Sequence, residues 1–395
     1  MIRFDHKFLY RGMDQLERFQ IALRREGEPD RVPSFCQGIM PLFMEKWDKK
    51  FGEEVSDEEI VITNLKDFTI YKHLGFDSSW VGTPSGSRIF SEESEKLYKK
   101  MNDEMPVEEK AKGYKISRDG ARVHVGTLNG LPYTYTHEGV LRTPELFEAW
   151  YGDSYISDPP ENAVDLINST LKQALEKDIV PIFSTHLISE PLISTISIGA
   201  ATYWAKKFPD KLRKAFDIIM QSSYQKLDLI CQSEAPFIIV ADDCAYKNRP
   251  IYSPKFYEEF IIPHWIKFIN KAHKHDKLVI FHSDGFVEPY YPLLINAGLD
   301  AQQSLEPIAG MDLKHLKETY GNKLTLIGNM DVSRLIPYAT KEEVIEATKK
   351  CLKDGAPGGG FIFSTCSDLT NSCKLENAIT MMETYRKYRN YPIKI

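Results

Sequence analysis

Short apolar runs alternate with longer amphipathic stretches along most of this chain of 395 residues. The runs are rich in β-branched or aromatic residues, and each is followed by a polar turn and then by a helical pattern such as residues 256–274 or 341–352;. This alternation predicts an α/β protein, a (β/α)8 TIM barrel, although an open doubly wound sheet shares the same pattern. The predicted barrel strands are 32–37, 78–81, 179–183, 237–241, 278–282, 301–305, 324–327 and 361–364.

Two segments depart from this rhythm. A helical pattern over residues 13–25, broken by Gly27-Glu-Pro, predicts an N-terminal helical extension over residues 1–31;. Residues 86–160 instead alternate around turn signals such as Asn129-Gly, which predicts antiparallel strands at 114–117, 122–127 and 131–136;. We therefore expect one domain over residues 1–395, with an inserted β-hairpin region at 86–160 that caps one mouth of the barrel.

Composition narrows the range of partners. The chain has 42% hydrophobic and 27% charged residues, and Lys plus Arg number 50 against 56 for Asp plus Glu. The net charge of -6 and the lack of a basic block argue against nucleic acid;. Residues 1–12 carry no apolar run of signal-peptide length, and no later stretch is long enough for a membrane span, so we expect a cytoplasmic protein;. Oligomeric state, including a homodimer, stays open.

Polar residues that directly follow the predicted strands are the candidates for chemistry, because barrel enzymes build their sites where strands end. Four loops qualify: Asp242-Asp243 after one strand, His282-Ser-Asp284 after the next, Asn329-Met-Asp331, and Cys366 after the last. Adjacent side chains point to opposite sides of a strand, so at most one of Asp242 and Asp243 faces the barrel axis. The other would cap a helix or pack outward.

His282, Asp284 and Cys366 are residue types that bind zinc, and three protein ligands leave one coordination position for a substrate;. Isolated residues of these types more often have structural roles, as a hydrogen-bonded histidine, a helix cap and a buried thiol. The six cysteines form no CxxC pair, so most are expected to be reduced and buried;. Glu190 and His186 follow the third strand and are further candidates, whereas Asp77 is expected to be a solvent-facing loop carboxylate.

A series of short motifs resembles the signature of the uroporphyrinogen decarboxylase superfamily. Each motif is weak, but their order and spacing hold over nearly the whole chain. The motifs are Glu17-Arg-Phe, Pro29-Asp-Arg-Val-Pro33, Asp242-Asp243, Ser253-Pro-Lys-Phe256, Pro263, Phe281-His-Ser-Asp-Gly285, Gly298-Leu-Asp300, Gly328-Asn-Met-Asp331 and Glu376-Asn377.

The resemblance implies a branch within that superfamily. True decarboxylases carry an arginine-rich loop after the first strand, whereas residues 33–41 contain no arginine to grip the carboxylates of a porphyrinogen;. The corrinoid-dependent methyltransferases bind zinc through a His-x-Cys pair and a later cysteine, positions similar to His282, Asp284 and Cys366. Asp284 stands where those enzymes have cysteine, and a less thiolate-rich zinc suits an oxygen leaving group better than a sulfur nucleophile.

These observations predict a zinc-dependent methyltransferase of the O-demethylase type. It would move a methyl group from a small methylated donor, such as a methoxyaromatic, to the Co(I) of cobalamin on a partner corrinoid protein. Asp242 or Asp243 and Glu190 would act in catalysis, and the remaining candidates would bind substrate: Trp80, His186, Phe286 and Asn329. The alternatives are a metal-free decarboxylase or lyase acting on a smaller substrate, and a barrel that only binds a ligand.

Overall fold

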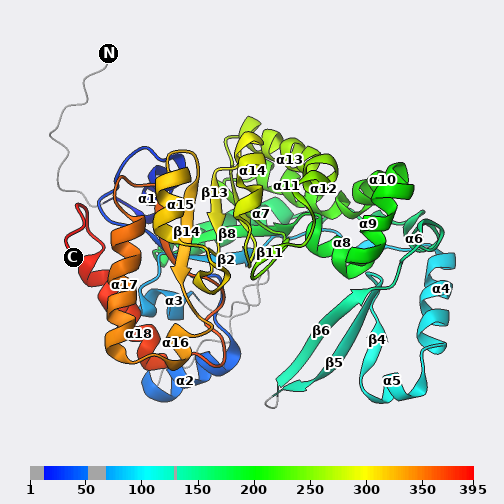
Figure 1. Ribbon diagram of the computed structural model, residues 1–395, viewed down its shortest axis with the longest axis horizontal. Coiled ribbons are helices and arrows are strands. Elements are labelled where there is room, and N and C mark those ends of the chain that lie inside the picture. The colour runs from blue at the N-terminus through cyan, green and yellow to red at the C-terminus, as the bar shows by residue number, and fades with distance from the viewer. Residues whose placement is uncertain (1–12, 52–67, 129–130) are drawn as a thin grey trace.

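The computed structural model describes residues 13–51, 68–128 and 131–395 (Figure 1). Residues 1–12, for which we expect no signal peptide, and the predicted turn at Asn129-Gly lie outside the described residues. No helix in the described part of the chain is long and apolar enough to cross a bilayer.

Eight parallel strands form a nearly closed barrel, which confirms the (β/α)8 fold. They are β1 (Ser34–Phe35), β2 (Ser78–Gly82), β8 (Val180–His186), β9 (Phe237–Ala241), β12 (Leu278–His282), β13 (Ala301–Gln303), β14 (Thr325–Met330) and β15 (Phe361–Thr365). Their order in the sheet is β1-β15-β14-β13-β12-β9-β8-β2, so each strand lies beside its neighbour in the chain. A parallel bridge between Cys36 and Ser79 and a 3.1 Å hydrogen bond from Cys36 N to Ser78 O join β1 to β2, which rules out an open sheet.

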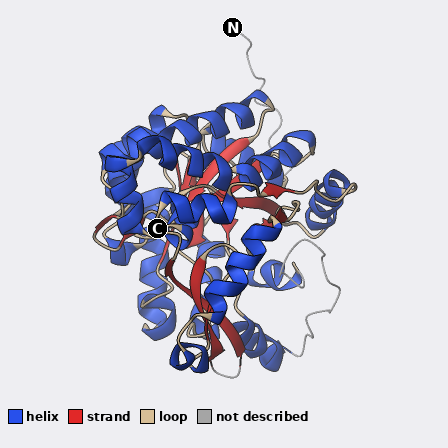
Figure 2. Cartoon of the chain, turned by 90° about the vertical axis from the view of Figure 1, so that its right-hand side faces the viewer, coloured by secondary structure: helices blue, strands red, loops and turns tan. Residues whose placement is uncertain are grey.

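Helices surround the strands of the barrel (Figure 2). Their bounds are α1 Gln15–Arg24, α2 Pro41–Phe51, α3 Thr69–Leu74, α4 Glu92–Asp103, α5 Val107–Ala111, α6 Pro144–Tyr151, α7 Ala163–Glu176, α8 Ser189–Thr195, α9 Ile198–Lys207, α10 Pro209–Ile219, α11 Gln221–Gln232, α12 Pro254–Phe256, α13 Ile262–Lys274, α14 Tyr291–Asn296, α15 Leu313–Tyr320, α16 Leu335–Tyr338, α17 Lys341–Gly355 and α18 Leu375–Tyr388. The helix predicted at 256–274 contains a π-helical turn at Tyr257–Ile261. The helix predicted at 341–352 begins with a Thr340–Glu343 capping box;.

Alternating side chains of each strand supply two apolar cores. Leu278 and Ile280 of β12 belong to the smaller cluster, whereas Val279 and Phe281 belong to the larger one that includes the surrounding helices. Burial on both faces explains why the strands are continuous apolar runs in the sequence. The smaller cluster lies inside the barrel, and it fixes which residues at the strand ends face the barrel axis.

Helix α1 packs against the interior core. Phe19, Ala22 and Leu23 are fully buried in the same cluster as the inward-facing strand residues. The hydroxyl of Thr325, the first residue of β14, lies 2.9 Å from the Ala22 carbonyl oxygen, which places α1 at the N-terminal end of the strands. The other mouth lies at the C-terminal ends of the strands, the side on which barrel enzymes bind their substrates.

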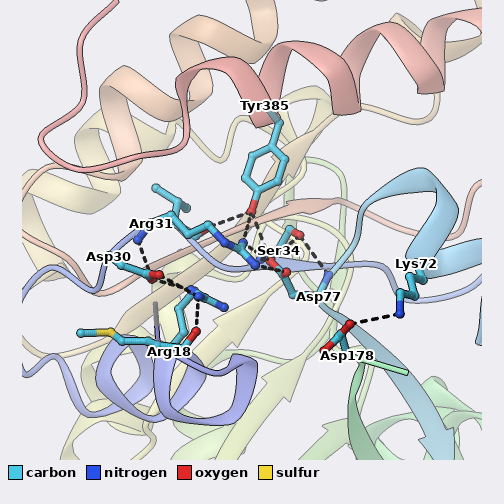
Figure 3. Close-up of polar contacts among 10 residues, drawn as sticks. Arg18, Asp30, Arg31, Ser34, Lys72, Asp77, Asp178 and Tyr385 are labelled. Atoms are coloured by element: carbon cyan, nitrogen blue, oxygen red, sulfur yellow. Dashed lines mark hydrogen bonds and ion pairs between the residues drawn. The ribbon is translucent and has the colours of Figure 1, made fainter. Parts of the chain in front are cut away.

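Two ion pairs hold this end together, and they come from the Pro29-Asp-Arg motif (Figure 3). Arg18 of α1 pairs with Asp30 at 2.7 Å, and Arg31 pairs with Asp77 at 2.5 Å. Asp77 also accepts hydrogen bonds from Ser34 N and Ser34 Oγ, each at 2.9 Å. The expectation of a solvent-facing Asp77 is therefore wrong: its side chain is 5% exposed and belongs to the scaffold.

The inserted segment forms a separate antiparallel sheet of β4 (Tyr114–Ile116), β5 (Ala121–Leu128) and β6 (Leu131–Gly139). These strands match the three predicted ones, and a further short pair is formed by β3 (Arg88–Ile89) and β7 (Tyr155–Ile156). Strands β5 and β6 run away from α8 on the side to which the arrow of β14 points, which is the substrate side (Figure 1). That the insertion caps the mouth stays a prediction.

Candidate functional site

Three side chains at the C-terminal ends of β9 and β12 bring their ligand atoms together. Asp243, His282 and Asp284 each offer one such atom, and these atoms all lie within 4.8 Å of one another. His282 Nε2 lies 3.9 Å from Asp243 Oδ1. His282 ends β12, and the two carboxylates stand on the loops that follow β9 and β12. We call these three residues the triad.

The structure separates the roles of Asp242 and Asp243, which the sequence left open. Asp242 points outward, is fully buried and accepts hydrogen bonds from Ser189 N at 2.6 Å, Ser189 Oγ at 3.0 Å and Glu190 N at 3.3 Å. It therefore satisfies the first turn of α8, and burial raises its pKa to about 7;. Asp243 faces the barrel mouth with its side chain 48% exposed.

Gln303 at the end of β13 orients the ring of His282. Gln303 Nε2 lies 3.4 Å from the Thr365 carbonyl oxygen, so its Oε1 faces His282 Nδ1, with which it is in hydrogen-bond contact. An amide oxygen only accepts, so Nδ1 carries a proton, and Nε2 is the ring atom that faces Asp243;. The Trp80 ring lies edge-on to the imidazole, with 5.2 Å between ring centroids.

A strained turn after β13 places a hydroxyl on Asp284. Ser304 and Leu305 have φ values of 117° and 53°, which non-glycine residues rarely adopt;. Ser304 Oγ thereby lies 2.7 Å from Asp284 Oδ1 and 2.8 Å from the Cys366 carbonyl oxygen. Gly328 leaves room for the turn, because a Cβ there would lie 2.5 Å from Ser304 O. The strain is stored directly beside the triad.

Cys366, the third ligand predicted from the sequence, is not one of the three residues in this group. Its Sγ is buried and lies 3.6 Å from the Leu305 carbonyl oxygen. Burial, followed by the nearby Glu306 carboxylate, raises the pKa of this thiol well above its usual value;. The backbone of Cys366, not its sulfur, is the part that connects to Asp284 through Ser304.

Sequence reasoning missed two acidic residues beside the triad, Glu306 and Asp368. Burial raises the pKa of both, and the charge of Asp284 raises each further. Glu306 also accepts a 2.8 Å hydrogen bond from Gly285 N. Both residues follow barrel strands, β13 and β15, so the strand-end rule that selected the other candidates would have found them;.

The remaining candidates lie in different surroundings. His186 and Glu190 form a half-exposed ion pair, with 3.0 Å between Nδ1 and Oε2, and both line a cavity of about 460 Å³. Asn329 Nδ2 instead contacts two backbone carbonyls, Leu305 O and Met311 O, and so ties down the loop after β13. Phe286 is partly buried against the main apolar core. Roles for these four residues in substrate binding or catalysis stay predictions.

Comparison with known proteins supports the fold, and two curated relatives of the chain have different activities. Residues 194–388 match the family model of uroporphyrinogen decarboxylase. The chain is 28% identical over 137 residues to a uroporphyrinogen decarboxylase of Geobacter sulfurreducens, covering 34% of this chain and 37% of that protein. It is 23% identical over 174 residues to a methylated-thiol–coenzyme M methyltransferase of Methanosarcina mazei, covering 44% of each. The chain thus spans less than half the length of either curated relative.

One solved structure matches nearly the whole chain. A methyltransferase from Methanosarcina mazei superposes with a TM-score of 0.63 and 19% identity, covering 95% of this chain and 99% of that one. At this identity the match shows a shared fold, which includes the barrel described above.

Proposed function

Because the chain belongs to the uroporphyrinogen decarboxylase superfamily and fits its methyltransferase branch, we propose that it is a metal-dependent methyltransferase. It would take a methyl group from a methoxyaromatic donor and pass it to the Co(I) of cobalamin on a separate corrinoid protein. The observation that carries this proposal is the triad of one imidazole and two carboxylates at the open mouth of the barrel.

The residues present fit a divalent ion such as zinc. The neutral tautomer of His282, fixed by Gln303, is the form that binds metals, and Asp243 and Asp284 supply two anionic oxygens;. Glu306 and Asp368 add further carboxyl groups close by, and burial raises the pKa of both;. A bound cation would stabilise their charged forms. An ion bound here would act as a Lewis acid on the ether oxygen of the donor.

The ligand set favours an oxygen over a sulfur as the atom that loses the methyl group. Two carboxylates and an imidazole donate less electron density than thiolates, so they suit polarisation of an ether more than activation of a thiol. The Methanosarcina relative is named for methylated thiols. We therefore infer a different donor for this chain, with Cys366 outside the ligand set.

The protein's own groups would orient the donor and handle protons. The Trp80 ring forms a wall beside His282, against which an aromatic ring can stack;. Glu190, hydrogen-bonded to His186, stands at the edge of the same mouth and can relay a proton toward the leaving oxygen;. Since α1 covers the other mouth, the donor and the corrinoid protein must approach from one side.

A metal-free decarboxylase acting on a smaller substrate is the second candidate. Similarity to the Geobacter decarboxylase and the raised pKa of Asp243 and Glu306 favour it, because a carboxyl group with a raised pKa keeps its proton to higher pH and can donate it to a carbanion;. Residues 33–41 contain no arginine that could bind the carboxylates of a porphyrinogen;. A porphyrinogen is therefore a poor substrate, whether the protein is a methyltransferase or a decarboxylase.

Metal analysis combined with a methyl-transfer assay tests the proposal. Protein purified without chelator should hold about one zinc per chain. His282→Ala should lose this zinc and Cys366→Ser should keep it. With a reduced corrinoid protein and 4-methoxybenzoate, the cobalt absorption should change with wild type and Cys366→Ser but not with His282→Ala. Metal-free protein that releases CO2 from a carboxylic acid would establish the decarboxylase instead.

A further inference from the structure

A polar cavity of about 460 Å³ is lined by residues of the inserted segment and of the barrel. The insertion contributes Arg88 and Tyr151, β8 contributes His186, and α11 contributes Lys226. A volume in this range suits a small molecule. The cavity is therefore large enough for the part of a substrate that does not react.

The cavity is lined by groups of both charges. Glu190 already has a partner, since its Oε2 lies 3.0 Å from His186 Nδ1. Arg88 donates to neutral acceptors, Ser154 Oγ at 3.0 Å and Ile218 O at 2.8 Å among them, and its guanidinium lies 5.1 Å from the Tyr151 ring centroid. Asp119 supplies a carboxylate at the solvent-exposed rim.

Lys226 is the more informative cation. Within the described ranges of the chain, no carboxylate pairs with its ammonium group, and burial lowers its pKa. A partly buried ammonium that lacks a counter-ion carries a desolvation cost that an anionic ligand would offset. Lys226 thus gives the cavity an ammonium group with no carboxylate beside it, whereas the charge of Asp119 acts on Arg88.

The sheet register relates His186, which lines the cavity, to His282 of the triad. His186 of β8 and His282 of β12 are each paired with Ala241 of β9, so the two histidines end neighbouring strands on either side of one residue. Because successive side chains of a strand point to opposite faces, both histidines face the interior of the barrel. Two strand spacings make roughly 10 Å between their backbones. This is the length scale of one benzene ring with substituents at its two ends.

From this geometry we infer that the cavity is an anion subsite, and that the methyl donor is a methoxylated aromatic carboxylic acid. Its carboxylate would bind to Lys226 and Arg88 while the methoxy oxygen reaches the triad. This assignment rests on the proposed function for the methoxy end of the donor. The subsite itself rests on the cavity and its cations.

Direct binding measurements on the full chain test the subsite without requiring turnover. By calorimetry, wild-type protein should bind 4-methoxybenzoate at least about ten-fold more tightly than 4-methoxybenzamide, its neutral isostere. Lys226→Met keeps the aliphatic stem and removes the charge, and it should weaken binding of the acid about ten-fold without affecting the amide. Lys207→Met, at an exposed position on α9, is the matched control and should change neither ligand. Thermal unfolding of all three proteins checks that they fold.

The outcomes separate the subsite from the methyltransferase itself. Equal binding of acid and amide, no measurable binding of the acid, or a loss shared by both ligands in Lys226→Met would overturn the subsite. Tight, Lys226-dependent binding of the acid with no methyl transfer from it would support the subsite and count against the proposed reaction. Efficient methyl transfer from neutral methoxyarenes, unaffected by Lys226→Met, would uphold the reaction and overturn the subsite.

Discussion

At the scale of single residues, adjacent side chains have opposite tasks at the end of a strand. Asp242 and Asp243 differ by one position, yet one is fully buried under α8 and the other is half-exposed at the mouth. The two-residue period of a strand is the cause, because it turns successive side chains to opposite faces. The same period places His282 and Gln303 inside the barrel, where they meet.

Alanine substitutions at these two aspartates should have opposite effects. Asp242→Ala leaves the donors of Ser189 and Glu190 N without a partner, so the free energy of unfolding should fall by about 1–3 kcal/mol with zinc affinity largely kept;. Asp243→Ala should abolish zinc binding and leave stability nearly unchanged. Urea unfolding and zinc titration measure the two effects. Loss of zinc in Asp242→Ala alone would contradict this assignment.

Gln303 should affect zinc affinity indirectly, because it orients the ring of His282. Gln303→Leu removes the acceptor that fixes the imidazole tautomer, so zinc affinity should fall about 10–100-fold;. Gln232→Leu, on the exposed surface of α11, is the control and should bind zinc like wild type. Competition with a chromogenic chelator gives both affinities. Unchanged affinity in Gln303→Leu would show that the amide does not position the ring.

At the scale of elements, the ion pairs at the N-terminal end of the barrel should contribute different amounts to stability according to their burial. The Arg31 and Asp77 side chains are 13% and 5% exposed, whereas those of Lys72 and Asp178, on the same end of the barrel, are 49% and 58% exposed (Figure 3). A charge that loses its partner in a buried site costs far more than one that water can solvate.

Replacing the cation of each ion pair by leucine tests this difference. Arg31→Leu leaves the buried Asp77 carboxylate without its cation and should lower the free energy of unfolding by about 3–5 kcal/mol;. Lys72→Leu removes an exposed pair and should cost less than about 1 kcal/mol;. Denaturant titration at fixed salt compares them. Similar losses for both would mean that burial does not set the strength of these pairs.

Asp300, in the Gly298-Leu-Asp300 motif, joins helix α13 to strand β12 through its side chain. Asp300 Oδ2 lies 2.8 Å from His273 Nε2 and also accepts a 2.8 Å hydrogen bond from Val279 N. The hydrogen bond to Asp300 raises the pKa of His273. The folded protein therefore holds this proton more tightly than the unfolded chain does.

The stability that this pair contributes should depend on pH. It is fully present below the unfolded histidine pKa and is lost as pH rises through the folded value. The difference in free energy of unfolding between wild type and His273→Gln should therefore be larger at about pH 5 than at about pH 9. Equilibrium unfolding at both values provides the measurement. A difference that grows with pH would contradict the assigned charge state.

At the scale of the whole molecule, the two ends of the barrel have separate roles. The N-terminal end is covered by α1 and holds the Asp30, Arg31, Asp77 and Asp300 contacts, whereas the triad and the cavity lie at the C-terminal end. In barrels of this kind, residues at the N-terminal end serve stability and those at the C-terminal end serve chemistry.

A large-to-small substitution in α1 should therefore affect stability alone. Phe19 is fully buried against the interior core, so Phe19→Ala should lower the free energy of unfolding by about 3–5 kcal/mol;. Zinc affinity per folded chain should stay at the wild-type value. Tyr338→Ala, at a site that is 73% exposed, should change stability by less than about 0.5 kcal/mol;. A parallel loss of zinc in folded Phe19→Ala would show that the two ends are coupled.

The sequence by itself determined the elements of the barrel, whereas its closure was decided by the contacts between β1 and β2. All eight strands and the antiparallel insert were predicted within a few residues, because burial on both faces gives continuous apolar runs that end in polar turns. It also selected Asp243, His282 and Asp284 as candidates, because they directly follow such runs. These features are local in the chain.

Only the tertiary structure decided which candidates meet. The chain separates β9, β12 and β15 by many residues, so no local pattern decides whether Asp243 or Cys366 lies beside His282. The burial of Asp77 and the cavity around Lys226 likewise depend on contacts between distant segments. Periodicity in a sequence records which face of a strand is buried, but distances between side chains on different strands are fixed only when the barrel closes.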